Sequence, residues 1–371
     1  MRRNLATIAA ALWSLSIATA AHAQAVAPHY GAVFDSIAIV RLTDGVYAFI
    51  SPDSRSAFVS GNNLLVIGRD AALVVDAGHF PSLTRKVIAE VKRLTSVPVR
   101  YLVNTHWHED HLAGNAEYAK AFPGLSIVST VATRDTVRRK VPTMIADEVK
   151  NYPGFATQLH QRLDAGVTAE GAPIPAFSLE YNRNELRDLE RAIPELASIS
   201  VVPPTLAFDH ELLIDLGGRD VELLWLGLGN TPGDAVAWVP DAKVVATGDL
   251  IVAPTPYAFG SFIYDWPATL RRLMALPAVA IVPGHGPVMH DWSYANLVAT
   301  MLDTLGAQMT RAASAPSLDS ASTRIDLRGF RTTFTGDDPY LQRAFDRFFL
   351  PSALQRAYEE ASRRLSQQPR P

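Results

Sequence analysis

The feature that most constrains this chain is a group of metal-binding side chains on one short segment. Three histidines and an aspartate fall within six residues, at His106, His108, Asp110 and His111. They directly follow residues 99–103, a β-rich run that predicts a strand. Imidazole nitrogens and carboxylate oxygens are ligands that zinc prefers. On a loop, His106 with His108 and Asp110 with His111 can bind two neighbouring cations. The sequence therefore predicts a metal centre on a loop after a strand, with a pH-sensitive surface histidine patch as the alternative.

Apolar periodicity divides the rest of the chain into two strand-rich halves around a different middle segment. Strand-like runs occupy residues 36–50, 62–67, 72–76 and 99–103, and they resume between 206 and 282. Residues 131–200 carry denser charge and few such runs, which predicts a helical insertion. Residues from about 291 onward have helical spacing, with breaks expected near 313–323 and at Pro351. This order suits two packed sheets with helices on their outer faces.

Composition excludes several classes of function. The 371 residues include 37 acidic and 34 basic side chains, so the net charge of -3 gives no electrostatic reason to expect a nucleic-acid partner. The chain has no cysteine, which rules out disulfides, a thiol nucleophile and a cysteine-ligated metal. No Gly-x-Ser-x-Gly segment occurs, so a serine hydrolase is unsupported.

The first residues resemble an export signal. Arg2 and Arg3 precede an apolar run over residues 5–17, and Ala21-His22-Ala23 offers a small-x-small cleavage site. The run is too short to span a membrane comfortably, and no second apolar stretch reaches spanning length. We expect a signal peptide over residues 1–23 and a periplasmic or secreted protein without a membrane span. An amphipathic or anchoring helix is the alternative.

The segment His106-Trp107-His108-Glu109-Asp110-His111 resembles the signature of the metallo-β-lactamase superfamily. Four further segments resemble the family's other motifs in the same order, and the match covers about residues 37–298. These segments are Asp76-Ala77-Gly78, Gly229-Asn230-Thr231-Pro232-Gly233-Asp234, Thr247-Gly248-Asp249 and Val282-Pro283-Gly284-His285-Gly286.

The resemblance implies a fold and an arrangement of metal ligands. The fold is α+β, a four-layer αββα sandwich over residues 30–300, with the helical insertion at 131–200 and a helical C-terminal extension at 301–371. One or two zinc ions are implied. His106 and His108 belong to the first metal site, Asp249 bridges, and the second site takes Asp110, His111 and His285. Asp76 is expected to hydrogen-bond the ligand loop or a ligand histidine from behind.

One position departs from the family pattern, because Asn230 stands where the family has histidine. An amide oxygen can bind a cation but is a weaker zinc ligand than imidazole. Three readings stay open. Asn230 coordinates in a weakened first site, or it supports the site from outside and leaves the second site as the working one, or the centre has lost hydrolytic competence.

Residues around these motifs give weaker signals about the substrate. Tyr257, Phe259 and Tyr264 follow Asp249 closely and are candidates to wall a substrate cleft, with core packing as the alternative. His79 either faces the cleft or lies on the surface. Trp107 and Glu109 alternate with the ligands and are expected to point away from them.

Together these observations predict an exported zinc-dependent hydrolase of a small-molecule substrate. A metal-bound hydroxide would attack an ester, lactone, amide or β-lactam carbonyl, and Asp110 would orient that water as well as bind metal. The alternative is a metal-binding accessory protein of a periplasmic oxidation system with little or no hydrolase activity. Oligomeric state and exact substrate are not indicated by the sequence.

Overall fold

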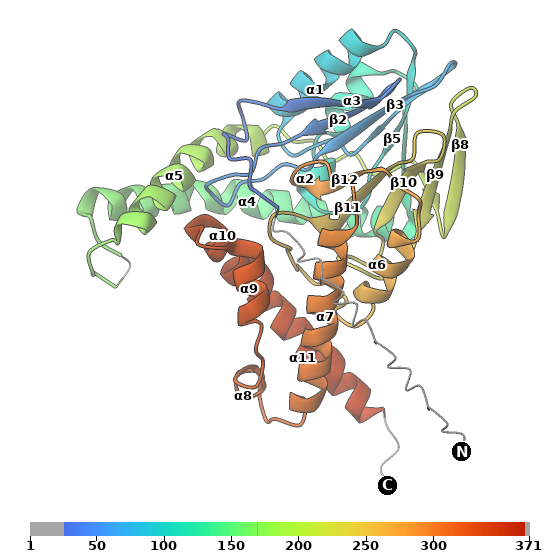
Figure 1. Cartoon of the computed structure of the whole chain (residues 1–371). Helices are drawn as coiled ribbons and strands as arrows, with labels where there is room; N and C mark the ends of the chain where they lie inside the picture. The colour runs from blue at the N-terminus through green and yellow to red at the C-terminus, as the bar shows by residue number, and fades with distance from the viewer. Residues whose placement is uncertain (1–25, 169, 368–371) are drawn as a thin grey trace, which may run out of the picture.

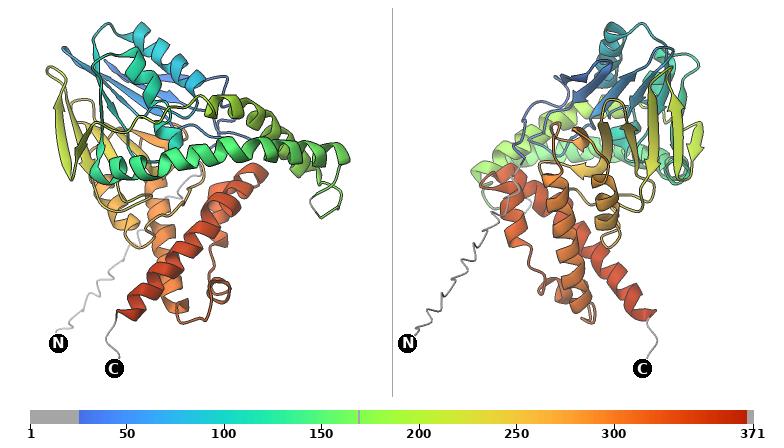
Figure 2. Two further views of the ribbon diagram at one scale, coloured as in Figure 1. Left: turned by 180° about the vertical axis from the view of Figure 1, so that it is seen from behind. Right: turned by 45° about the vertical axis from the view of Figure 1, so that its right-hand side comes forward.

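Two β-sheets packed face to face form the body of the protein (Figures 1 and 2). The computed structural model describes residues 26–168 and 170–367, so the predicted signal peptide at 1–23 lies outside the described residues. Within that described part, no helix combines the length and the apolar character that a membrane span requires.

The first sheet has seven strands in the order β1-β2-β3-β4-β5-β6-β7. Strands β1 to β4 pair antiparallel, and β4 to β7 pair parallel. The strands are β1 (Ala38–Thr43), β2 (Val46–Ile50), β3 (Asn63–Ile67), β4 (Ala72–Val75), β5 (Val99–Val103), β6 (Ser126–Thr130) and β7 (Leu206–Phe208). The parallel strands all end at one edge, so the segments that follow them gather there.

The second sheet has five strands in the order β12-β11-β10-β9-β8. Only β11 and β12 run parallel, and the other pairs are antiparallel. The strands are β8 (Glu211–Asp215), β9 (Asp220–Trp225), β10 (Ala235–Val239), β11 (Val244–Val252) and β12 (Ala280–His285).

Successive side chains of a strand point to opposite faces of the sheet, one toward the core between the sheets and the next toward the outer helices. In β3, Leu64 and Val66 belong to the apolar core between the two sheets, whereas Leu65 faces the helical layer outside. Residues of the second sheet such as Leu223 and Ala237 complete the central core from the other side. The inner strands β4, β10, β11 and β12 are buried on both faces and are mainly apolar, whereas the edge strands β1 and β8 are partly exposed. Helices cover the outer faces of both sheets, so the four-layer αββα prediction is confirmed.

Helices cover both outer faces. The first sheet is covered by α1 (Pro81–Leu94) and α3 (Asn115–Ala121), with the short α2 (Glu109–Leu112) at the sheet edge. The second sheet is covered by α6 (Trp266–Met274) and α7 (Ser293–Ala312), which share one apolar cluster with the C-terminal helices.

The predicted insertion consists of two long helices, α4 (Val131–Ala165) and α5 (Ala176–Leu196). They pack against each other along one side of the sandwich, and α4 extends well beyond it (Figure 2). Both helices lie within the helical insertion predicted over 131–200. Pro142 and Pro153 lie inside α4, where proline removes a backbone donor that a helix interior normally uses, so local propensity does not indicate a single long helix there.

The tail forms a helical layer below the second sheet, as predicted (Figure 1). It comprises α8 (Leu318–Ser322), α9 (Arg328–Thr335), α10 (Pro339–Ala344), a π-helical turn η1 (Phe345–Phe349) and α11 (Leu350–Ser366). The predicted loop near 313–323 contains the short α8. Pro351 lies in the first turn of α11, where the missing donor costs nothing, so it marks a helix start.

Candidate metal centre

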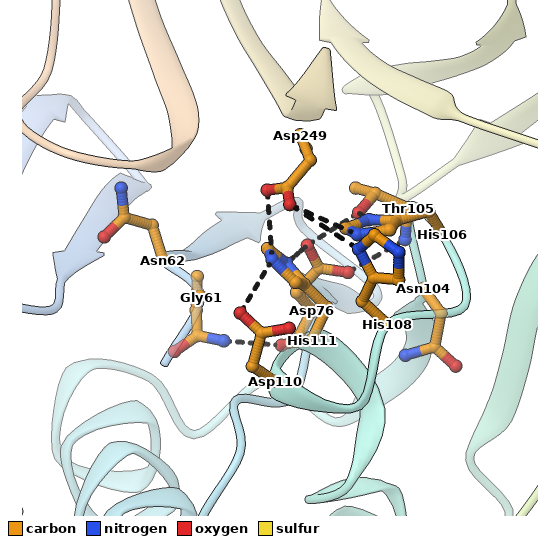
Figure 3. Close-up of polar contacts among 12 residues, drawn as sticks. Gly61, Asn62, Asp76, Asn104, Thr105, His106, His108, Asp110, His111 and Asp249 are labelled. Carbon is orange, nitrogen blue, oxygen red and sulfur yellow. Dashed lines mark hydrogen bonds and ion pairs between the residues drawn. The ribbon is translucent and has the colours of Figure 1, made fainter. Parts of the chain in front are cut away.

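The predicted ligands meet where strand ends of both sheets converge (Figure 3). His106 and His108 follow β5, and His111 lies on α2, which begins immediately after His108. Asp249 comes from β11 and His285 from the last position of β12. The second sheet therefore supplies two ligands to a site whose other ligands follow β5 of the first sheet. Residues more than 100 positions apart are thereby brought to one buried point.

Four donor atoms surround one point in the arrangement expected for a cation. His285 Nε2 lies 2.9 Å from Asp110 Oδ2 and 3.6 Å from Asp249 Oδ1, and His111 Nε2 lies 3.5 and 3.1 Å from the same oxygens. The two imidazole nitrogens are 3.2 Å apart. Ligands of a tetrahedral zinc at about 2.05 Å are about 3.3 Å from one another. The residues present therefore fit the second metal site.

A second set of donors faces the other oxygen of Asp249. Asp249 Oδ2 lies 3.4 Å from His106 Nε2 and 3.8 Å from His108 Nδ1. His106 Nε2 is buried and has no hydrogen-bond partner among the described residues. Because Asp249 directs one oxygen to each set, it is positioned to bridge two cations. The set of His106, His108 and Asp249 Oδ2, which corresponds to the first metal site, also fits a cation. It has fewer strong donors than the set around Asp249 Oδ1.

Burial and neighbouring charges favour the ligand form of two of these groups, neutral His106 and ionised Asp249. Burial lowers the pKa of His106 to about 4, so its imidazole is neutral at pH 7 with a lone pair to donate. Burial alone would raise the pKa of Asp249, but the neighbouring histidines, first His111 and then His106, hold it well below its ordinary range. Both side chains are almost fully buried, so these electrostatic interactions are little screened by solvent.

Two glycines allow the ligands to pack this closely. A Cβ at Gly61 would overlap the imidazole of His111, and a Cβ at Gly284 would overlap Asp249 Oδ1. Gly61 also donates its backbone N–H to the carbonyl of Asp110 at 2.9 Å (Figure 3). The loop after β2 and the end of strand β12 therefore fit the centre only without side chains at these two positions.

Asp76 sets the tautomers of two ligand histidines. Its Oδ2 accepts from His111 Nδ1 and from the Thr105 hydroxyl, both at 2.8 Å, and its Oδ1 accepts from the Thr105 backbone N–H. Since the Thr105 hydroxyl donates its proton to Asp76, its oxygen accepts from His106 Nδ1 at 3.0 Å. Both histidines thus carry a proton on Nδ1 and direct Nε2, the nitrogen that would bind a metal, toward the centre. The expected supporting role of Asp76 has a geometric basis in these bonds.

Comparison with known proteins identifies the family. The model of the metallo-beta-lactamase superfamily matches residues 57–285, well over half of the chain. The chain belongs to the metallo-β-lactamase superfamily.

Individual relatives of this superfamily member are distant. A linear primary-alkylsulfatase from Pseudomonas sp. (strain ATCC 19151) is 25% identical over 227 residues, which cover 58% of this chain and only 40% of the relative. A metallo-beta-lactamase type 2 from Bacteroides fragilis is 20% identical over 262 residues, covering 68% of this chain and 81% of the relative. The solved metallo-beta-lactamase from Pontibacter korlensis has a TM-score of 0.51 and 19% identity, covering 72% of this chain and 99% of that one. These matches establish a metallo-hydrolase superfamily and its fold, but no substrate.

Asn230, the residue that departs from the superfamily pattern, is fully buried, next to the Asp249 oxygen that faces His106 and His108. Its Oδ1 accepts from the Ser261 hydroxyl at 2.8 Å, and its Nδ2 lies 3.4 Å from Asp249 Oδ2. A serine hydroxyl can either donate to an amide oxygen or accept from an amide nitrogen, so Ser261 can hold the amide in either orientation. No sequence signal pointed to Ser261, which is 31 residues away.

A cavity of about 470 Å³ opens over the metal ligands. Asp110, Asp249 and His285 lie at its floor, and two of the predicted substrate residues, Tyr257 and Phe259, line its wall. The structure does not bring Tyr264 to this cavity. The Tyr264 hydroxyl instead donates to the Gly306 carbonyl of α7 at 3.0 Å.

Several residues that line the cavity were not expected there. Trp107 and Glu109 line it, contrary to the prediction that they point away. That prediction assumed strand alternation, whereas the segment is an irregular turn leading into α2. His79 is buried and lines the cavity, which excludes the surface alternative. The insertion and the tail supply further aromatic walls that no local motif could reveal: Tyr152 and Phe155 of α4 and Phe348 of η1.

Proposed function

We propose that this protein is an exported zinc-dependent hydrolase that cleaves a small ester, lactone, amide or β-lactam. The observation that carries the proposal is the geometry of Asp249, whose two oxygens face two separate sets of buried histidine donors. Export rests on the predicted signal peptide at residues 1–23.

The chain offers ligands for two zinc ions. His106, His108 and Asp249 would hold the first, with Asn230 as a weaker fourth donor, and His111, Asp110, His285 and Asp249 would hold the second. Bound zinc lowers the pKa of water toward neutrality and polarises a substrate carbonyl, the two requirements for hydrolysis without a strong base. Asp76 keeps His106 and His111 in the tautomers that binding requires.

Asp110 is the residue placed to orient the attacking water. Its Oδ2 faces His285 at 2.9 Å, and its side chain also lines the cavity floor. A carboxylate in this position can accept a hydrogen bond from water beside the substrate. The aromatic walls exclude bulk solvent around it, which strengthens electrostatic stabilisation of the developing negative charge.

The cavity fits a small organic molecule. Its volume lies within the range of about 300–1,000 Å³ typical of small-ligand sites. Its walls are mainly aromatic and aliphatic, from Phe58, Trp107, Phe155, Phe259 and Phe348. The substrate would therefore carry an apolar or aromatic part beside the scissile bond. Since one relative is named an alkylsulfatase, alkyl sulfate esters belong in the substrate screen.

The test compares Asp249→Ala with Asp147→Ala, a matched change on the exposed face of α4. Purified proteins are loaded with zinc and screened against esters, lactones, β-lactams and alkyl sulfates. We expect turnover of at least one class, its loss in Asp249→Ala and its retention in Asp147→Ala. Zinc binding without turnover of any class would contradict the hydrolase and support the accessory role.

A further inference from the structure

A second cavity, of about 350 Å³, adjoins the substrate cavity. Phe155, Glu185 and Arg347 line both, so the two spaces share a wall. The lining residues of the second cavity come from α4, α5 and the segment between them in the insertion, and from α10 and η1 of the tail. Figures 1 and 2 show α10 approaching the two insertion helices. The second cavity contains none of the metal ligands.

Three arginines from separate elements line this second cavity: Arg162 of α4, Arg343 of α10 and Arg347 of η1. Within residues 26–168 and 170–367, none of them has a carboxylate oxygen within 4.0 Å. The Nε atoms of Arg162 and Arg343 are also buried there without a hydrogen-bond partner. A buried donor on a charged group costs free energy when left unpaired, so these atoms indicate a missing acceptor.

Two carboxylates of the described residues, Glu170 and Glu185, also line the cavity, and neither forms an ion pair with these arginines. Glu185 Oε2 instead accepts the backbone N–H of Ala57 at 2.7 Å. Arg343 meanwhile stacks over the ring of Tyr181, with its guanidinium carbon 4.1 Å from the ring centroid. Stacking fixes the plane of the guanidinium and leaves its edge free for a planar or tetrahedral anion. The lining of the cavity carries three guanidinium groups against two carboxylates, a small net positive charge, with one guanidinium held in place by stacking.

We propose that the second cavity binds an anionic group of the substrate, a carboxylate, sulfate or phosphate, at the end remote from the scissile bond. The assignment rests on the proposed hydrolase function. The scissile bond lies at the metal centre, the apolar body of the substrate passes Phe155, and the anion reaches the guanidinium groups of Arg162 and Arg343. The substrate is therefore an amphiphilic acid rather than a neutral ester.

Kinetics with matched substrates test this assignment. The 4-nitrophenyl monoesters of adipic and suberic acid carry a terminal carboxylate, and 4-nitrophenyl hexanoate and octanoate are their neutral counterparts. Arg162→Met and Arg343→Met are expected to raise KM for the acids about tenfold or more, since a hydrogen bond to a charged group has a magnitude of this order. KM for the neutral esters should change less than twofold. Equal effects on both kinds of ester would overturn the assignment.

A binding measurement separates this assignment from the hydrolase proposal. Octane-1-sulfonate, which is not hydrolysed, is titrated by calorimetry into the zinc-loaded protein. Binding should weaken at least tenfold in both methionine variants and stay unchanged in Arg138→Met, which removes an exposed arginine of α4. Arg343→Lys keeps the positive charge, so its octane-1-sulfonate affinity should fall less than that of Arg343→Met. This difference distinguishes loss of the charge from a folding defect. Arginine-dependent binding without any turnover would refute the hydrolase alone, whereas binding that is absent or indifferent to the arginines would refute the anion site.

Discussion

Replacing Asp76 by Asn tests the proton arrangement behind the metal centre. Asp76 Oδ2 accepts hydrogen bonds from His111 Nδ1 and from the Thr105 hydroxyl, and the Thr105 oxygen in turn accepts one from His106 Nδ1. An amide group is nearly isosteric with the carboxylate, and Asn also tolerates the positive φ of 59° at this position. If the new NH₂ group faces His111, it donates where the ring should donate. The ring then carries its proton on Nε2 and cannot bind zinc.

The magnitude follows from the bonds that are lost. Removing one partner behind a ligand histidine typically costs 10- to 100-fold in metal affinity, or about 1.4–2.7 kcal/mol. Asp76 serves His111 directly and His106 through Thr105, so we expect a loss near the upper end, about 100-fold.

The assay is a zinc titration against a chromophoric chelator, with Asp147→Asn as the matched exposed control. Thermal unfolding of the metal-free proteins checks that Asp76→Asn still folds. Zinc affinity within about threefold of the parent protein would refute the proton arrangement described here.

Three further predictions follow from the same structure. Asn230→His should raise affinity for the second zinc ion equivalent by supplying an imidazole beside His106 and His108; a competitive zinc titration that shows one unchanged weak site would contradict it. Tyr257→Phe and Phe259→Ala should alter KM, whereas Tyr264→Phe should leave both KM and kcat unchanged because its hydroxyl bonds α7; steady-state kinetics on one active substrate decides. Burial raises the pKa of Asp53 to about 6, so the native state binds its proton more tightly than the unfolded chain, and stability falls as pH rises from about 4 to 6 by up to about 1.4 kcal/mol per unit. Asp53→Asn should remove that part of the slope in urea titrations of the metal-free protein, and an unchanged slope would refute the assignment.

Local sequence motifs were sufficient to predict most of the metal-centre residues. The His106–His111 segment follows a strand and contains four ligand side chains, so its metal-binding role can be predicted from the sequence alone. Asp249 and His285 were assigned through resemblance, because only the packing of two sheets explains why they meet the first segment.

The walls of the site were beyond sequence reasoning for a physical reason. Ser261, which holds Asn230, and Phe348, which walls the cavity, make contacts set by tertiary packing over long sequence separations. The three arginines of the second cavity lie on surface-like helical segments, and only the approach of α10 to α4 and α5 gathers them. Tyr264 shows the converse, since proximity in sequence to Asp249 did not place it in the cavity.

The most direct test of the central claim is the metal content per chain, measured by elemental mass spectrometry on protein purified without added metal. The two donor sets sharing Asp249 predict zinc in every chain, between one and two equivalents, with the second equivalent completed on adding zinc. A protein that contains no zinc and takes none up would contradict the account of this site as a metal centre.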